Sequence, residues 1–121
     1  MTPTHYVADA GALIAYLRSE PGYDVFEAAL SQPGAICYAH AANLAEVFYD
    51  SIRVRGETRA RELLGDISAI GVVFREDMDT AFWQDAARTK ADYRRVSLAD
   101  CFGLALARRV GGVFLTTDHH E

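Results

Sequence analysis

Near its N-terminus the chain reads Tyr6-Val7-Ala8-Asp9-Ala10-Gly11-Ala12-Leu13-Ile14-Ala15. Its first three residues form a short apolar run that is typical of a buried strand, and this run ends at Asp9. Apolar residues then recur at helical spacing from Ala10 to Leu17. A strand that passes directly into a helix, with an acid at the junction, predicts the first unit of an α/β fold.

The same alternation continues along the rest of the chain. Three further apolar runs predict strands at residues 35–38, 72–74 and 113–116. Helical patterns occupy residues 25–30, 44–56, 60–71, 78–90 and 97–110. Ser19 is a candidate N-cap for the second helix. Because the strands are apolar throughout rather than alternating, they predict a parallel sheet that helices cover on both faces.

The composition is that of an ordinary globular protein. With 121 residues, the chain predicts a single domain over residues 1–121 whose core needs no disulfide. Cys37 and Cys101 lack metal-binding spacing and are interpreted as small core residues in a reducing compartment. The N-terminus has no signal-peptide pattern, and no apolar run approaches the length of a membrane span. We therefore expect a cytoplasmic protein without a membrane association.

The net charge of −5 argues against a protein that only binds nucleic acid, because such proteins usually carry a basic surface. The argument weakens if several of the acids bind divalent cations, since the bound ions reverse the local sign of the charge.

Two acids directly follow predicted strands. Asp9 comes after the first strand and Asp118 after the last. Sites in open parallel sheets form beyond the carboxyl ends of the strands, so both residues are candidates. Taken singly, each acid can equally serve as a helix N-cap or a turn residue.

Asp100 and Glu46 lie on predicted helices. Ser97-Leu98-Ala99-Asp100 fits a capping box, which explains an acid there without a catalytic role. The helix is otherwise so apolar, however, that this carboxylate must enter a largely buried element, which favours a partner such as a metal. Glu46 lies opposite the apolar stripe of its helix, and its pattern alone predicts a solvated side chain.

Taken together, the four acids would be chemically specific. Carboxylates about 5 Å apart repel one another by roughly 3 kcal/mol per pair at an effective dielectric constant of about 20. Such a cluster persists at neutral pH only if it takes up protons or binds cations. Oxygen ligands favour Mg²⁺ or Mn²⁺ over zinc. These ions activate water and stabilise the charge on a phosphoryl group, so the cluster predicts phosphodiester hydrolysis.

Four segments, in the same order along the chain, resemble the motifs of PIN-domain nucleases. The opening stretch of residues 6–15 is similar to the strand that ends in the family's first acid. Asn43-Leu44-Ala45-Glu46-Val47 resembles the segment with the acidic Glu, and Ser97-Leu98-Ala99-Asp100-Cys101 the segment with the third acid. Leu115-Thr116-Thr117-Asp118 is similar to the closing Thr-x-Asp. Together these segments span nearly the whole chain.

The resemblance implies a three-layer α/β/α sandwich around a mostly parallel sheet of four or five strands. It implies that Mg²⁺ or Mn²⁺ is held by four acids: Asp9, Glu46, Asp100 and Asp118. Thr116 would supply a hydroxyl near the site. The small size is most similar to the VapC toxins of type II toxin–antitoxin pairs, which are cytoplasmic homodimers that cleave RNA and are silenced by a cognate antitoxin.

Two features depart from the family pattern. Gly11 stands where many members have Ser or Thr, and its lack of a hydroxyl can weaken the positioning of metal or phosphate. The family usually continues past the fourth acid into another strand, whereas this sequence ends at Glu121, which leaves open both a naturally short protein and a trimmed end. Two alternatives therefore remain beside the toxin: a housekeeping PIN nuclease in RNA maturation or on DNA structures, and a PIN-fold binding module without catalysis.

Two basic clusters and one apolar stripe have two interpretations each. Arg88, Lys90, Arg94 and Arg95 form the first cluster, and Arg53, Arg55, Arg59 and Arg61 the second. Either cluster can hold RNA phosphates or simply keep the surface soluble. Tyr23, Val25 and Phe26 can line a groove for an antitoxin helix, or they can pack in the core.

Overall fold

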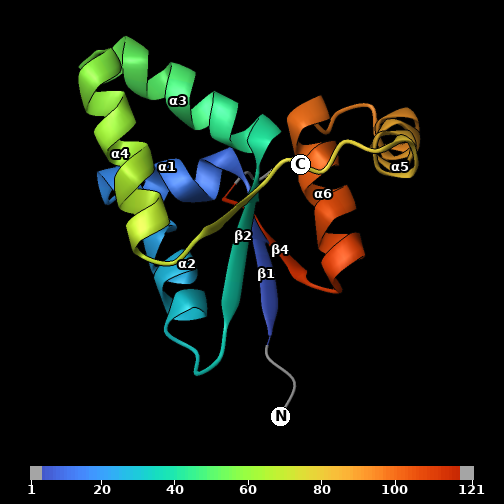
Figure 1. Cartoon of the computed structure of the whole chain (residues 1–121), viewed down its shortest axis with the longest axis horizontal. Helices are drawn as coiled ribbons and strands as arrows, with labels where there is room; N and C mark the ends of the chain where they lie inside the picture. The colour runs from blue at the N-terminus through green and yellow to red at the C-terminus, as the bar shows by residue number, and fades with distance from the viewer. Residues whose placement is uncertain (1–3, 118–121) are drawn as a thin grey trace.

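Four short parallel strands form the centre of the molecule in the computed structural model, which describes residues 4–117. These are β1 (His5–Ala8), β2 (Ile36–His40), β3 (Val73–Arg75) and β4 (Val113–Leu115), in the spatial order β3-β2-β1-β4 (Figure 1). Tyr6 of β1 pairs with Cys37 on one side and with Val113 on the other. The predicted parallel sheet is confirmed over this part of the chain.

Helices cover the sheet on both faces. One face carries α1 (Ala10–Arg18), α2 (Tyr23–Leu30), α3 (Ala41–Arg55) and α4 (Glu57–Ala69). The other face carries α5 (Thr80–Asp92) and α6 (Leu98–Val110), as Figure 1 shows. The predicted α/β/α sandwich is therefore confirmed. No helix within residues 4–117 is both long enough and apolar enough to cross a membrane.

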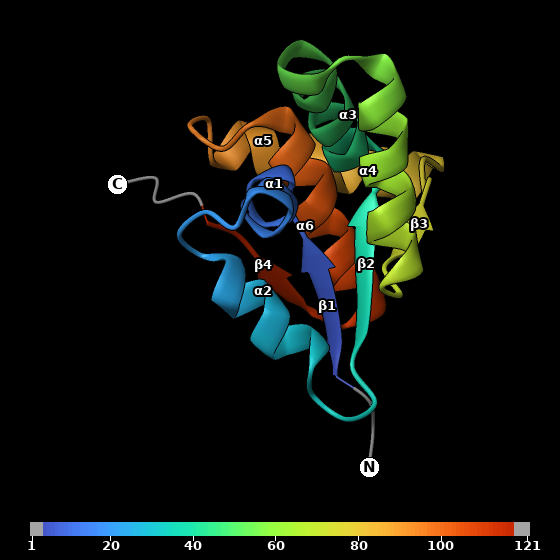
Figure 2. The ribbon, with the colours of Figure 1, turned by 90° about the vertical axis from the view of Figure 1, so that its left-hand side faces the viewer.

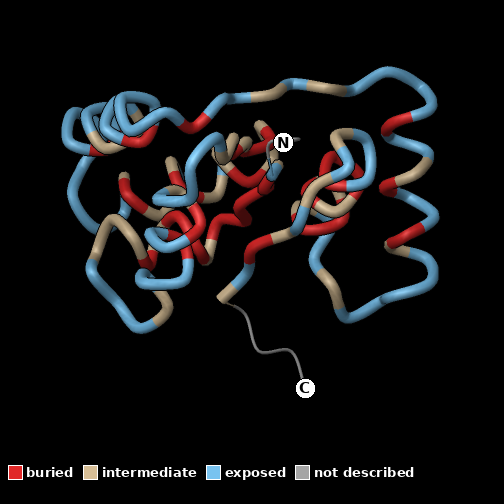
Figure 3. The backbone as a smooth tube through the Cα atoms, turned by 90° about the horizontal axis from the view of Figure 1, so that it is seen from below, coloured by how far each residue is buried: buried red, intermediate tan, exposed pale blue. Residues whose placement is uncertain are grey.

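Each face of the sheet has its own apolar core, because successive residues of a strand point in opposite directions. Tyr6 and Ala8 of β1 pack among α1, α2 and α3, whereas Val7 packs against Phe82 of α5 and Leu106 of α6. Figure 3 shows α5 at the right-hand edge, with its buried positions all on the side that faces the rest of the molecule. Val7 is fully buried, so the central strand is enclosed from both sides.

The outer strand β3 departs from the prediction of a sheet buried throughout. Val73 and Phe74 are 42% and 39% exposed, respectively. Among the strands within residues 4–117, β3 pairs with β2 alone, so its apolar run is that of an edge strand. The prediction that apolar strands are fully buried is confirmed for the central strand β1 and was wrong for the edge strand β3.

The junction between α1 and α2 also differs from the prediction. Ser19 ends α1 in the left-handed conformation, with φ 52°, rather than capping α2. Gly22 is the N-cap of α2, at φ 101°, and a Cβ atom there would lie 2.6 Å from Cγ2 of Thr117. Glycine is required at this position both by the backbone conformation and by the close approach of Thr117.

Cys37 and Cys101 are both buried free thiols, as predicted. Burial raises the pKa of the Cys37 thiol to about 12, so it stays protonated and unreactive near neutral pH.

Candidate active site

The parallel sheet brings several chain junctions to one edge of the molecule. The carboxyl ends of β1 and β2 lead directly into the N-termini of α1 and α3 (Figure 2). The N-terminus of α6 lies at the same edge, since a hydrogen bond joins the first turns of α3 and α6. Helix N-termini carry partial positive charge and unpaired N–H groups, so this edge favours negatively charged groups.

Asp9 lies at the junction of β1 and α1, and its side chain is fully buried. Its Oδ1 accepts a hydrogen bond of 2.7 Å from the backbone N–H of Ala12, which makes it the N-cap of α1. Its own backbone N–H donates to the carbonyl of Leu115 over 3.0 Å. This bond joins the end of β4, and with it the start of the Thr116 segment, to the Asp9 junction.

Asp100 lies in the first turn of α6 and is only 6% exposed. Its backbone N–H donates to Oγ of Ser97 over 3.1 Å, so the predicted Ser97 cap is confirmed. The predicted burial of this carboxylate is also confirmed. Asp9 and Asp100 are therefore two buried acids, each at the positive end of a helix.

Asn43 is the residue at this edge that sequence reasoning did not single out. It is fully buried, and its Nδ2 donates to the carbonyl of Ala99, which directly precedes Asp100, over 3.3 Å. Its Oδ1 is buried and has no hydrogen-bond partner within residues 4–117. Gly103 makes room first for the Phe114 ring, 2.5 Å from where a Cβ atom would lie, and then for Nδ2 of Asn43, at 3.1 Å. Asn43 thus links the helix that carries Glu46 to the backbone beside Asp100.

Glu46 and Thr116 occupy less enclosed positions. Glu46 lies three residues after Asn43 in α3, on the same side of that helix, and is half-buried rather than fully solvated. Thr116 follows β4 and is exposed. It lines a hollow of about 360 Å³ together with Pro21, Gly22, Val25 and Thr117.

The predicted cluster of four acids is only partly covered by the structure. Asp118 lies outside the described residues. Within residues 4–117, no three His, Cys, Asp or Glu side chains form a group arranged to hold a metal ion. The structure brings the junctions of Asp9, Asn43 and Asp100 to one edge, and the metal-binding roles stay a prediction.

His40 is a second residue whose role the sequence did not reveal. It ends β2, is fully buried and caps α3: its Nδ1 accepts from the N–H of Ala42 at 3.0 Å. Its Nε2 lies 2.8 Å from the carbonyl of Asp77 and donates to it, which defines a neutral ring. The ring stacks between Phe82 and Phe102, at centroid distances of 5.1 and 5.3 Å.

Two further acids, Asp77 and Asp79, follow the carboxyl end of β3, and arginines bind both. Arg75 donates two hydrogen bonds of 2.8 Å to Asp77, and Arg109 contacts both acids. The hydrogen bonds from Arg75, and then from Arg109, lower the pKa of Asp77 to about 2. Arg109 likewise lowers the pKa of Asp79 to about 2. These acids stabilise the loop between β3 and α5.

One cation of the first basic cluster has a structural role. The Nζ atom of Lys90 donates to the carbonyls of Arg94 and Val96, at 2.8 and 2.7 Å. Lys90 therefore closes the loop between α5 and α6, directly before the helix that carries Asp100.

The sequence matches the PIN domain family over residues 6–120, and the chain belongs to that family. No curated protein matches the sequence. The fold is similar to that of VapC20 from Mycobacterium tuberculosis, described as a toxin that cleaves the sarcin–ricin loop, with a TM-score of 0.73, 14% identity and coverage of 93% of this chain and 89% of that chain.

Two structures of VapBC pairs show the same fold. VapBC2 from Rickettsia felis, bound to a DNA fragment from its promoter, gives a TM-score of 0.70 at 14% identity, with coverage of 95% of this chain and 89% of that chain. VapBC-1 from nontypeable Haemophilus influenzae gives a TM-score of 0.69 at 14% identity, with coverage of 95% of this chain and 87% of that chain. At this identity the likeness establishes the fold.

Proposed function

We propose that this PIN-domain protein is a divalent-metal-dependent endoribonuclease and the toxin of a VapBC-type toxin–antitoxin pair. The observation that carries the proposal is the burial of two carboxylates, Asp9 and Asp100, at helix N-termini on one edge of a parallel sheet. Burying a charged carboxylate is costly unless hydrogen bonds or a cation compensate for it. An acid that serves only to keep the surface soluble would lie exposed to water rather than buried at a helix N-terminus.

The donor atoms at this edge fit a hard divalent cation. Asp9 and Asp100 supply carboxylate oxygens, and Asn43, whose Oδ1 is buried, supplies an amide oxygen. Mg²⁺ and Mn²⁺ prefer such oxygen ligands and often keep several waters. In this proposal Asp9, Asp100 and Asp118 hold the ion, with Glu46 as a further ligand or water-orienting group and Thr116 as a nearby hydroxyl.

When bound, the cation supplies a more acidic water and stabilises charge on the phosphoryl group. The protein's own contribution is to fix the donor atoms before the substrate arrives. The N–H of Ala12 holds the Asp9 carboxylate, and Nδ2 of Asn43 holds the backbone that precedes Asp100. Such fixed geometry reduces the reorganisation needed during hydrolysis.

The choice of an RNA substrate and an antitoxin partner draws on the fold neighbours. VapC20 is described as cleaving the sarcin–ricin loop, and two neighbours are VapBC complexes. The proposal also includes a homodimer, which light scattering of the purified protein tests. Exposed aromatic residues on α3 and α5, Tyr49 and Trp83, offer apolar surface for such an interface.

The test is incubation of the purified protein with total cellular RNA in Mg²⁺, in Mn²⁺ and in EDTA, beside the Asp100→Asn variant. Discrete products that require the metal and are absent with Asp100→Asn support the proposal. Cleavage of structured DNA rather than RNA, or processing of RNA precursors alone, would indicate a housekeeping nuclease. Absence of cleavage together with tight RNA binding that ignores Mg²⁺ would indicate a binding module.

A further inference from the structure

A short turn joins α5 to α6 beside the proposed acidic site. Tyr93 ends α5, and the backbone N–H of Val96 donates to the carbonyl of Tyr93 over 3.0 Å, which closes the turn. Ser97 follows as the N-cap of α6, whose first turn carries Asp100. Figure 2 shows this α5–α6 turn at the end of the sheet toward which the arrow of β1 points.

Lys90 fixes the shape of the α5–α6 turn. Its Nζ atom donates to the carbonyls of Arg94 and Val96, at 2.8 and 2.7 Å. Both hydrogen bonds have a charged donor and are therefore stronger than bonds between neutral groups. A turn whose backbone is already held in place loses less conformational entropy when a ligand binds to its side chains.

The turn presents an aromatic ring and two cations to solvent. Tyr93 is 62% exposed, the largest fraction for any large hydrophobic residue within residues 4–117. Arg94 and Arg95 are exposed as well. An exposed ring beside two cations is a combination that binds single-stranded nucleic acid, because the ring stacks on an unpaired base and the cations contact phosphates.

Most arginines of the chain are paired with acids, but those of the turn are not. Six form ion pairs with Asp or Glu: Arg18, Arg59, Arg61, Arg75, Arg108 and Arg109. Five have no such pair in the described part of the chain: Arg53, Arg55, Arg88, Arg94 and Arg95. Three of these five lie in α5 or in the turn after it. Asp92 is the only acid in residues 88–95, so this stretch favours an anionic ligand.

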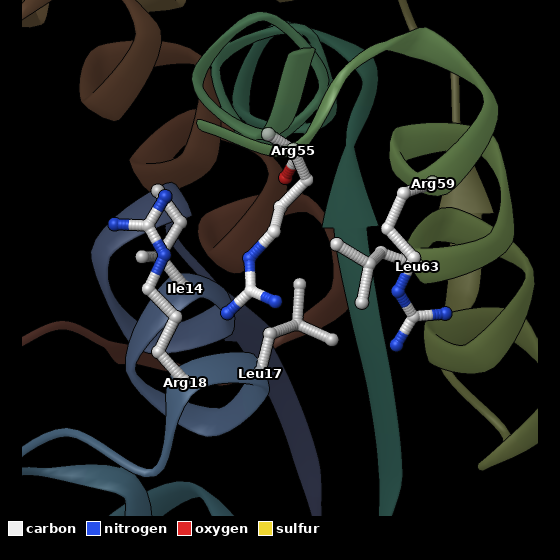
Figure 4. A pocket seen from close by; sticks show the side chains of 7 residues that line it. Ile14, Leu17, Arg18, Arg55, Arg59 and Leu63 are labelled. Carbon is white, nitrogen blue, oxygen red and sulfur yellow. The ribbon is translucent and has the colours of Figure 1, made fainter. Parts of the chain in front are cut away.

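The second basic cluster of the sequence is less suited to a nucleic acid. Two of its four arginines, Arg59 and Arg61, form ion pairs with acids about one helical turn away. A third, Arg55, lies beside Leu17 and Leu63 in Figure 4 and lines a cavity of about 50 Å³. Such a cavity holds roughly one or two groups of the size of water and does not admit a nucleotide.

We propose that the α5–α6 turn binds single-stranded RNA next to the cleavage site. The ring of Tyr93 stacks on a base, and the guanidinium groups of Arg94 and Arg95 contact phosphates. Arg95 lies five residues before Asp100, so their Cα atoms are within about 18 Å. A strand of about five stacked nucleotides spans that distance. The inference rests on the proposed function in taking RNA as the substrate.

The test is the affinity for a fluorescein-labelled 12-nucleotide single-stranded RNA, measured by fluorescence anisotropy. The Asp100→Asn background is used, because the proposed function predicts no cleavage there. Tyr93→Ala should weaken binding about tenfold, whereas Tyr93→Phe keeps the ring and should change it less than about twofold. Tyr23→Ala removes an exposed ring from α2, on the opposite face of the sheet. This matched control should also change binding less than about twofold.

The dependence on salt tests the two arginines. Replacing Arg94 and Arg95 together by Gln should weaken binding about tenfold at about 150 mM salt and lower the slope of log affinity against log salt by about 1.4, since each phosphate contact contributes about 0.7 on a single strand. Arg53→Gln removes an exposed cation near the end of α3 and is the matched control, with an expected change in slope under about 0.3. Lys90→Gln should weaken binding with little change in slope, because Lys90 binds carbonyls of the turn.

Equal losses in Arg53→Gln and in the double variant of Arg94 and Arg95 would overturn the proposal, as would wild-type affinity in Tyr93→Ala. Equal losses with a 12-base-pair RNA duplex, in which no base is free to stack, would also contradict it. So would losses seen only with a Glu-rich 12-residue peptide, which would indicate an acidic protein partner instead.

Cleavage kinetics separate this inference from the proposed function. In the otherwise wild-type chain, Tyr93→Ala should raise KM for RNA about tenfold and keep kcat within about twofold, because the ring contributes binding rather than chemistry. A disturbed Asp100 would lower kcat instead. If the wild type cleaves no RNA but binds the single strand through Tyr93, the nuclease proposal fails and the binding element stands. If it cleaves RNA and Tyr93→Ala binds as the wild type does, only this inference fails.

Discussion

Two pairs of aspartates lie at the carboxyl end of the sheet, and the fold treats them differently. Asp77 and Asp79 are bound by Arg75 and Arg109 and have their pKa values lowered to about 2. Asp9 and Asp100 are buried at the N-termini of α1 and α6. The first pair lies beside arginine side chains at the surface of the β3–α5 loop, whereas the second pair is enclosed at helix N-termini, which carry partial positive charge.

Under the proposed function, this difference separates acids that stabilise a loop from acids that hold a cation. Sequence position alone does not separate them, because all four aspartates lie just after a strand or in the first turn of a helix. The predictions that follow test whether the two pairs are as different in function as they are in surroundings.

The largest difference is expected in RNA cleavage. Asp100→Asn and Asp9→Asn should each lower the rate about a hundredfold or more, since a lost metal ligand removes several kcal/mol of transition-state stabilisation. Asp79→Asn should stay within about twofold. Cleavage rates at saturating Mg²⁺, with circular dichroism as a check on folding, provide the measurement. Equal rates for Asp79→Asn and Asp100→Asn would remove the distinction between the pairs.

His40 connects the two regions, because it caps α3 and binds the carbonyl of Asp77. His40→Ala should lower the free energy of unfolding by about 3 kcal/mol, through a lost cap, a lost hydrogen bond and a void between two Phe rings. His5→Ala, which removes a stacked ring at the partly exposed start of β1, should cost under about 1 kcal/mol. Urea denaturation measures both, and similar losses would argue against a special role for His40.

Replacing Asn43 tests whether its hydrogen bond to the carbonyl of Ala99 positions the neighbouring Asp100. Asn43→Ala should destabilise the fold by about 2 kcal/mol, because the hydrogen bond from Asn43 to the carbonyl of Ala99 is lost and a void is left. It should also reduce cleavage more than this instability explains, at temperatures where the variant stays folded. Gln32→Ala removes only the partly buried hydrogen bond from Tyr6, and this control should cost under about 1 kcal/mol. A variant that cleaves RNA at the wild-type rate would show that the Asn43 contact does not position Asp100.

The smallest effect is expected for Asp77, one of the two acids bound by arginines. It is a contribution to the free energy of unfolding that depends on pH. The pKa of Asp77 falls from the ordinary 3.8 to about 2 on folding. Its stabilising contribution is therefore complete above about pH 4 and is lost as the pH falls through about 2. After allowance for solvent screening, this contribution is about 1 kcal/mol. Asp77→Asn should abolish it, and denaturation of both proteins at pH 7 and pH 2.5 measures the loss. If stability changed by the same amount between pH 7 and pH 2.5 in Asp77→Asn as in the wild type, the stabilising role of Asp77 would be contradicted.

Much of this fold was predictable because local signals agree with the tertiary structure. The run Tyr6-Val7-Ala8 is apolar on both faces, and β1 is enclosed on both faces. Ser97 caps α6 as its spacing with Asp100 indicates. The exposure of Val73 and Phe74 was not predictable from their run, since the order of strands in the sheet decides which strand is an edge.

The candidate site was predictable only in part. Asp9 could be identified because it ends a strand, and Asp100 because an acid in an apolar helix is unusual. Asn43 and His40 carry no such signal, since their roles depend on Ala99 and Asp77, which lie 56 and 37 residues away in sequence.

Calorimetric titration of Mn²⁺ into the wild-type protein, Asp100→Asn and Asp79→Asn tests the central claim most directly. We expect saturable binding by the wild type and by Asp79→Asn, and loss of binding by Asp100→Asn. Binding that is equal in all three proteins, or absent from a folded wild-type protein, would contradict the claim that the buried acids at this edge of the sheet hold a divalent cation.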